Sequence, residues 1–170
     1  MTMAVLSWVL AIPLLGVMTG LRTMTPIAVM CWFAYLGQAG TQDQGDLPVA
    51  GTWAFWTAKL VTVVIFTLFA LGEYVGDKLP QTPNRIAPGP LGARVIFGGL
   101  VGAIAATAME GSVIEGIILG SLGALVGAFV GYHVRKHLVE QSGRPDWNVA
   151  LLEDVSALLL SILALGIITG

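Results

Sequence analysis

Long apolar stretches separated by short polar segments make up most of the chain. A helix that crosses a lipid bilayer needs about 20 consecutive apolar residues, and most of the stretches approach that length. The pattern therefore predicts an all-α integral membrane protein, a bundle of six transmembrane helices in one domain over residues 1–170. The predicted helices run over residues 3–21, 25–36, 53–78, 91–109, 113–138 and 147–169.

A very short polar segment separates the first two predicted helices. Arg22 is the only charged residue in the range 3–36. One helix over this run would be about 50 Å long, against a bilayer core of roughly 30 Å, so the chain must break. We expect Gly20 to end the first helix, Thr25 to cap the second and Pro26 to lie in its first turn.

Three further features bear on the architecture. Pro13 is expected to kink the first helix.

If residues 25–36 form only a re-entrant piece, or the second half of a broken first span, the bundle has five spans. Six spans also divide into two groups of three with opposite orientation, the inverted repeat of small transporters. A Gly-x-Arg pattern is shared by residues 20–22 and 92–94.

The composition excludes several classes of protein. Hydrophobic residues make up 56% of the chain and charged residues 11%, whereas soluble domains contain about 25% charged residues. Disorder is therefore excluded, and the net charge of −2 argues against nucleic acid as a partner. The single cysteine, Cys31, excludes a disulfide scaffold within the chain. Membrane lipids are the expected partners, and no cofactor is predicted.

The polar segments between the predicted helices alternate between acidic and basic. Cytoplasmic loops of membrane proteins are enriched in lysine and arginine, so the basic segments are predicted to be cytoplasmic. Seven of the eight basic residues fall on that side: Arg22, Lys78, Arg85, Arg94, Arg135, Lys136 and Arg144.

Glycines spaced by four residues mark the predicted helices 91–109 and 113–138. Small residues at this spacing let helix backbones approach closely in lipid. We therefore expect tight packing there, within the chain or between copies. A homo-oligomer such as a dimer, or a partner membrane subunit, is predicted. The glycines concerned are Gly98, Gly102, Gly116, Gly120, Gly123, Gly127 and Gly131.

Charged residues gather at the predicted cytoplasmic border. Glu73 and Asp77 are four residues apart, so their carboxylates should face the same way at a helix C-terminus, where the macrodipole opposes them unless cations lie near. Ionisable groups at this depth are typical of functional sites, and they also form interhelical salt bridges. The candidate ion- or substrate-binding residues are Arg22, Glu73, Asp77, Lys78, Arg94, Glu153 and Asp154.

Several sequence blocks together resemble a bacterial family. They are Gly-Leu-Arg-Thr-Met-Thr-Pro at residues 20–26, Gly-Glu at 72–73 with Asp-Lys-Leu-Pro at 77–80 and Thr-Pro-Asn-Arg at 82–85, Ala-Pro-Gly-Pro at 87–90 with Ala-Arg at 93–94, and Leu-Leu-Glu-Asp at 151–154. In combination they resemble the small membrane proteins grouped as the domain of unknown function numbered 4126. The resemblance covers nearly the whole chain and implies a multi-pass protein of the bacterial inner membrane. That family has no settled activity, so the resemblance assigns no role to any residue.

The segment from Glu73 to Lys78 is also similar to a motif of six-span calcium and manganese exchangers, Glu-x-Gly-Asp-Lys/Arg-Thr/Ser. The similarity implies metal coordination by Glu73 and Asp77. Here one residue is inserted before Gly76, Leu79 stands where the motif has Ser or Thr, and the chain contains no second copy. The identity of any metal is therefore unknown from the sequence.

Two functions from different classes fit these features. One is a transporter or channel for a small ion or solute whose path passes the charged residues at the cytoplasmic border. The other is a structural or accessory membrane subunit in which the same charges are only salt bridges. The sequence contains no nucleophile–base pair and no phosphate-binding loop that stands out, so an enzyme is not expected.

Overall fold

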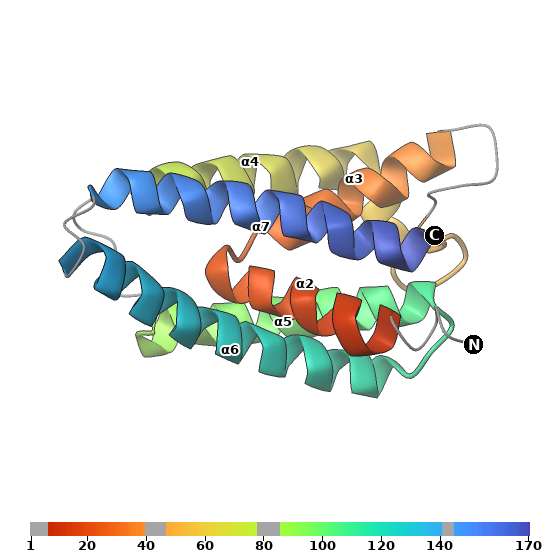
Figure 1. The fold of residues 1–170 in the computed structure, drawn as a ribbon. Helices are drawn as coiled ribbons and strands as arrows, with labels where there is room; N and C mark the ends of the chain where they lie inside the picture. The colour runs from red at the N-terminus through yellow and green to blue at the C-terminus, as the bar shows by residue number, and fades with distance from the viewer. Residues whose placement is uncertain (1–6, 40–46, 78–85, 141–144) are drawn as a thin grey trace.

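The computed structural model describes residues 7–39, 47–77, 86–140 and 145–170, and every regular element in these ranges is a helix. Consecutive α-helices run in alternating directions along one common axis (Figure 1). The elements are the π-helix η1 (Ser7–Ala11), α2 (Ile12–Leu21), α3 (Thr25–Ala39), the 3₁₀-helix η2 (Phe55–Ala58), α4 (Leu60–Gly76), α5 (Pro88–Ala108), α6 (Val113–Glu140) and α7 (Asp146–Thr169).

The prediction of an all-helical chain is confirmed in these ranges, and each predicted helix overlaps one of the helices α2 to α7, although α3, α5, α6 and α7 extend beyond the predicted bounds. By length and composition, α5, α6 and α7 can each cross a membrane, with 21, 28 and 24 residues. The stretch Trp8–Leu21 and α4 are apolar but shorter, and α3 has 15 residues. Three of the described helices therefore have the length that a membrane span requires.

The predicted break after the first helix is present, but two of its details were wrong. Helix α2 ends at Leu21 and α3 begins at Thr25. Gly20 lies inside α2, one residue before its end, and marks a close approach to α6: a Cβ at this position would lie 2.6 Å from the backbone nitrogen of Ala128. Thr25 is the first helical residue, and its hydroxyl bonds the hydroxyl of Tyr74 at 2.8 Å rather than capping the helix.

Pro26 lies where it was predicted, whereas Pro13 lies nearer to a helix start than was predicted. Pro26 lies in the first turn of α3, as predicted. Pro13 lies at the start of α2, directly after the π-helical turn η1. Proline lacks an N–H donor and crowds the preceding turn, and a π-helical turn is one way to accommodate such a residue.

The third predicted helix, residues 53–78, is interrupted near its start. Lys59 has an extended backbone, with φ −91° and ψ 134°, and separates η2 from α4. Helix α4 therefore spans only 17 residues, and Asp77 follows it directly as the C-cap residue.

The tightest part of the bundle is the trio of α2, α5 and α6, whose backbones meet at glycines. A Cβ on Gly98 of α5 would lie 2.7 Å from the carbonyl oxygen of Gly120 in α6. A Cβ on Gly123 of α6 would lie 3.0 Å from the Cα of Gly16 in α2. The predicted glycine packing is thus confirmed within the chain, and these glycine faces are used for intramolecular contacts.

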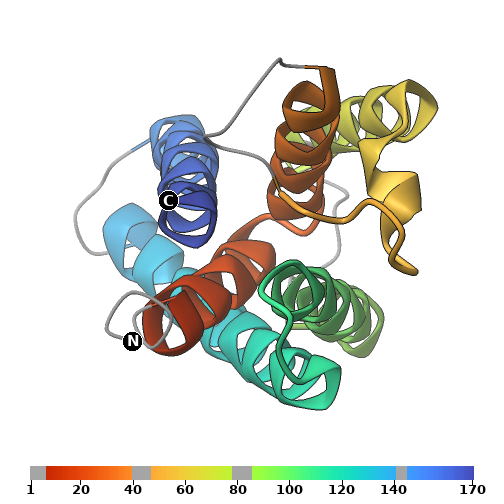
Figure 2. The same cartoon turned by 90° about the vertical axis from the view of Figure 1, so that its right-hand side faces the viewer.

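The remaining helices surround this trio less closely. Figure 2 shows α3 and α4 on the far side of α2 from α6, with α7 lying beside α2 and α3. Helix α4 buries only Val63 and Ala70. Most of its large apolar side chains, among them Val61 at 69% and Leu68 at 60% exposure, face outward.

The two groups of three helices pack differently. In an inverted repeat, α2 and α3 would pack as α5 and α6 do. Helices α5 and α6 lie side by side, whereas α2 and α3 diverge from their connecting turn (Figures 1 and 2). The described contacts therefore give no support to an inverted repeat.

Candidate functional site

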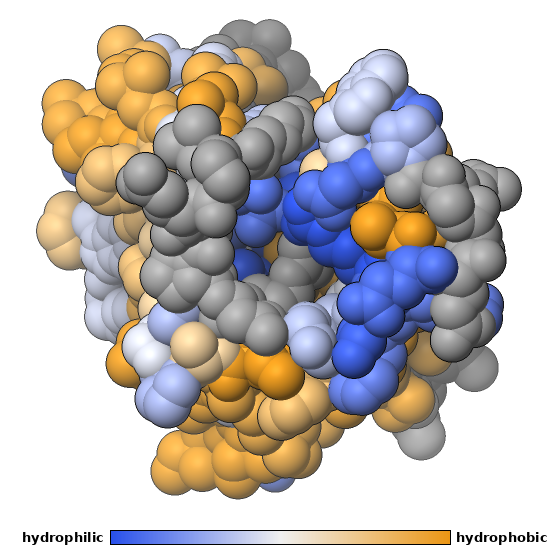
Figure 3. Space-filling model, turned by 90° about the vertical axis from the view of Figure 1, so that its left-hand side faces the viewer, coloured by the Kyte–Doolittle hydropathy of each residue, from blue (hydrophilic) through white to orange (hydrophobic). Residues whose placement is uncertain are grey.

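Charged side chains meet at one end of the bundle, at the left of Figure 1. At this end α2, α4 and α6 finish and α3, α5 and α7 begin. Figure 3 faces this end and shows hydrophilic residues in the middle and on the right, with hydrophobic residues mainly at the upper left and below. We call the following set the charged layer: Arg22, Glu73, Asp77, Arg94, Arg135, Asp146, Glu153 and Asp154.

Arg22 is the centre of the charged layer. Helix α2 ends well short of α6 and α7 at this end (Figure 1), so Arg22 lies inside the bundle and is completely buried. Its Nη1 lies 2.6 Å from Oδ2 of Asp77, and its Nε lies 2.6 Å from Oδ1 of Asp154. Its Nη2 lies 3.6 Å from Oε2 of Glu153 and donates to the carbonyl oxygen of Ala150 at 3.4 Å. A buried cation is tolerated only with such partners.

Arg135 of α6 connects the buried part of the layer to its exposed edge. Its Nη1 donates to Oδ2 of Asp77 at 2.6 Å, the same oxygen that Arg22 contacts. Its Nε and Nη2 donate to the two carboxylate oxygens of Asp146, both at 2.8 Å. The side chain of Asp146 is 55% exposed and that of Arg135 is 16% exposed. Arg135 therefore lies between solvent at this end and the carboxylates around Arg22.

Glu73 and Arg94 hold the two ends of the helix break. The carboxylate of Glu73 accepts hydrogen bonds from the backbone N–H groups of Thr23 and Met24, both at 2.8 Å, directly before α3. Helix N-termini have unpaired N–H groups and favour negative charge. Nη1 of Arg94 donates to the carbonyl oxygens of Gly20 at 2.6 Å and Leu21 at 2.9 Å, at the end of α2. The break is therefore held by charged side chains from α4 and α5.

The structure brings six of the seven predicted site residues into the charged layer, and Lys78 lies outside the described residues. Glu73 and Asp77, which are four residues apart, bind different partners: Glu73 binds backbone N–H groups and Asp77 binds arginines. Within the described ranges, no group of three or more His, Cys, Asp and Glu side chains is placed to hold a metal ion. The six residues are Arg22, Glu73, Asp77, Arg94, Glu153 and Asp154.

The sequence analysis missed Arg135 and Asp146 as members of the layer. Arg135 follows Gly127 and Gly131 at the same spacing of four residues. Residues at this spacing share one face of a helix, and Gly127 packs against Val17 of α2. The glycine pattern thus contained a signal that Arg135 points into the bundle.

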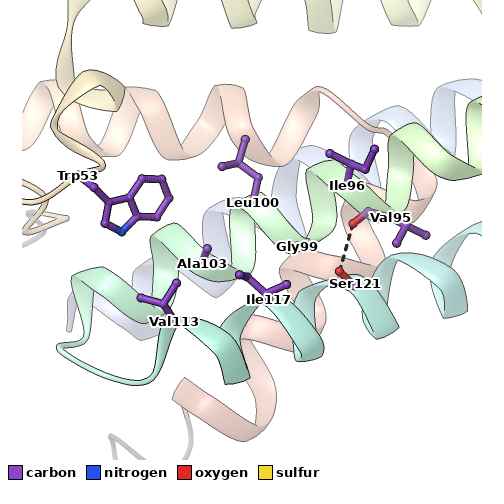
Figure 4. Close-up of a pocket in the computed structure, with 9 residues that line it drawn as sticks. All are labelled: Trp53, Val95, Ile96, Gly99, Leu100, Ala103, Val113, Ile117 and Ser121. Carbon is purple, nitrogen blue, oxygen red and sulfur yellow. Dashed lines mark hydrogen bonds between the residues drawn. The ribbon is translucent and has the colours of Figure 1, made fainter.

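One surface pocket borders the charged layer, and another lies farther along the bundle. The first, which we call the break pocket, has a volume of about 460 Å³ and is lined by Thr23, Met24, Phe69, Glu73, Pro90, Ala93 and Arg94. The second, of about 440 Å³, lies along α5 and α6 with Trp53 at one end (Figure 4). Its lining contains no charged residue, and the hydroxyl of Ser121 bonds the carbonyl oxygen of Val95 at 3.2 Å.

Comparison with known proteins found no matching family model, no matching curated protein and no matching solved structure. The family resemblance noted in the sequence stays a prediction.

Proposed function

We propose that the chain is a multi-pass protein of the bacterial inner membrane, with its six α-helices in or across the bilayer and its basic loops in the cytoplasm. The three long apolar helices and the outward-facing apolar side chains of α4 support this proposal. The distribution of lysine and arginine supports the orientation. Cysteines introduced at Gln81 and Gln141 are then expected to react with impermeant thiol reagents only from the cytoplasmic side. Reaction from outside intact cells would overturn the orientation.

For the activity, we propose transport of a small ion, a proton or a small cation, along a path through the charged layer. The observation that carries this proposal is the fully buried Arg22 at a helix break, within 4 Å of carboxylates of Asp77, Glu153 and Asp154. Ionisable groups inside a membrane are costly and are usually functional. Broken helices also build the ion sites of many transporters.

The charge balance favours a cation over an anion. Among the described residues, the charged layer contains five carboxylates and three guanidiniums. Carboxylates bind cations and relay protons. The side chains of Asp77, Glu153 and Asp154 are 8–12% exposed, so they contact solvent only slightly. Arg135 lies 2.6 Å from Asp77 and 3.5 Å from Glu153 and is itself 16% exposed.

The second candidate is a structural or accessory membrane subunit. The observation in its favour is the extent of pairing, since each guanidinium of the layer lies within 4.0 Å of at least one carboxylate. In this alternative the charges only hold α2, α4, α6 and α7 together at one end. The two candidates differ in what happens when a carboxylate loses its charge without losing its shape.

Flux measurement in proteoliposomes separates the two candidates. The purified protein is screened for flux of protons, divalent cations and small anions. If the layer carries the ion, Asp77→Asn and Glu73→Gln abolish flux and leave most of the fold intact, because an amide keeps the shape but loses the titratable proton. Exposed Glu115 of α6 provides the control Glu115→Gln, which is expected to keep full flux. Flux that survives both substitutions, or variants that fail only by unfolding, favours the accessory subunit.

A further inference from the structure

The break pocket lies beside the charged layer and has two different walls. Its apolar wall contains Phe69 of α4, which is 55% exposed, together with Pro90 and Ala93 of α5. Its polar wall contains Glu73 and Arg94. The pocket therefore joins an outward-facing apolar surface of α4 and α5 to the two side chains that hold the helix break.

The size and lining of the break pocket fit a ligand. Pockets that bind small molecules have volumes of about 300–1,000 Å³ and combine a mainly apolar lining with a few placed polar groups. The break pocket, at about 460 Å³, lies within this range. Since its apolar wall faces outward, the ligand is expected to be amphipathic, with its apolar part along Phe69 and its polar part at Glu73 and Arg94.

The charges of the pocket indicate what the polar part contains. Nη2 of Arg94 lies 3.9 Å from Oε1 of Glu73, so both signs of charge are present close together. A purely anionic headgroup would be repelled by Glu73, and a purely cationic one by Arg94. A carboxylate has about four acceptor positions and a guanidinium has five donors, so both can bind a ligand while holding the break.

We propose that the break pocket binds a phospholipid with a zwitterionic, amine-bearing headgroup, such as phosphatidylethanolamine. The phosphate lies toward Arg94, the ammonium group toward Glu73, and an acyl chain runs along Phe69 and Ala93. Guanidinium–phosphate and ammonium–carboxylate hydrogen bonds are charge-assisted and stronger than neutral ones. The inference rests on the proposed membrane location, but it does not depend on transport.

Native mass spectrometry of the detergent-purified full chain tests the proposal. Phosphatidylethanolamine and phosphatidylglycerol with identical acyl chains are titrated separately. One molecule of phosphatidylethanolamine is expected to bind about tenfold more tightly than phosphatidylglycerol, since only the former provides an ammonium group for Glu73. Equal binding of the two lipids would overturn the headgroup assignment.

Two variants locate the binding to the pocket. Ala93→Trp fills the space between the walls, and Phe69→Ala removes the exposed apolar contact; both are expected to weaken phosphatidylethanolamine binding about tenfold. Val75→Trp, on an exposed position of α4 outside the pocket lining, is the matched control and should bind as the wild type does. Melting temperatures show whether Ala93→Trp is folded. If it is not, the binding measured for Phe69→Ala alone shows whether the lipid binds in the break pocket.

The outcomes separate this proposal from the proposed transport. Unchanged binding in both pocket variants would place the lipid elsewhere and overturn the proposal, whatever the flux assay shows. Loss of binding in both variants supports it even if the protein transports nothing. A chain that is recovered in the soluble fraction, without lipid or detergent, would overturn the membrane location and with it this inference.

Discussion

The glycine-packed trio of α2, α5 and α6 and the charged layer meet at the end of α2, and they are held together in opposite ways. At the glycine contacts of the trio, no side chain separates the helices and their backbones touch, as where Gly98 faces Gly120. In the charged layer, long side chains reach across the bundle, as where Arg22 contacts Asp77 and Asp154. The glycine contacts of the trio contain no titratable side chain, so they act as a rigid support. The ion path that we propose runs through the layer instead.

The largest effect is expected from removing the cation at the centre of the charged layer. Arg22→Met removes the buried cation that contacts both Asp77 and Asp154, while Arg135 still contacts Asp77. Breaking a buried ion pair in this way costs about 3–5 kcal/mol of stability. Thermal melting in detergent is expected to show a large decrease in melting temperature.

A second substitution and a surface control sharpen this prediction. Adding Asp154→Asn to Arg22→Met removes part of the uncompensated negative charge and is expected to restore part of the lost stability. Lys59→Met changes an exposed cation, whose Nζ lies 5.8 Å from the ring centre of Phe55, and should melt like the wild type. If Arg22→Met also melts like the wild type, the ion pairs do not hold this end of the bundle.

A smaller effect is expected from adding one methyl group to the glycine trio. In Gly120→Ala the new Cβ would meet the carbonyl oxygen of Gly98 and lie 3.1 Å from the Cα of Gly102. Because these contacts are backbone atoms, the helices must separate, at a cost of about 1–3 kcal/mol. Gly166→Ala in α7 is the matched control, since a Cβ there meets nothing within 4 Å. Equal melting of the two variants would contradict backbone-to-backbone packing.

The smallest effect is expected at the cap of α3. Glu73→Gln keeps one acceptor oxygen for the N–H groups of Thr23 and Met24 but loses the negative charge at the helix N-terminus, which is worth about 1 kcal/mol. Hydrogen exchange of those two amides should become faster than in the wild type. Glu115→Gln leaves this cap untouched and is expected to leave both amides unchanged; faster exchange in the control as well would show a general loosening instead.

The sequence predicted the glycine packing of α5 and α6 better than the charged layer, although it did not predict that α2 joins them, and the reason is physical. Glycines such as Gly116 and Gly120 repeat at the period of the helix, so their packing face can be read from spacing alone. Which partner a charged side chain finds depends on how the helices are rotated and how deep they lie. Glu73 and Asp77 share a helix face and still bind different groups. Arg135 was missed because its neighbours Lys136 and His137 made the segment look like an exposed helix end.

At the helix break, too, the sequence located the element but not the side chains that bind it. Spacing and proline placement located the break between Leu21 and Thr25 correctly. The groups that hold it come from α4 and α5, about 50 and 70 residues away along the chain. The local capping rule predicted that Thr25 caps α3. In the structure, Glu73 and Arg94 bind the free backbone groups at the break instead.

Whether water reaches the charged layer from the side of the basic loops is tested most directly by thiol labelling at Asp77. The carboxylate of Asp77 is 12% exposed, and Cys31 is a buried free thiol that can be replaced. In Asp77→Cys/Cys31→Ala, in vesicles of known orientation, a small cationic methanethiosulfonate is expected to react from the basic-loop side and not from the other. Ser161→Cys, buried in α7, should stay unreacted. If Asp77→Cys reacts from neither side and reacts fully after unfolding, the layer is dry and the ion path is contradicted.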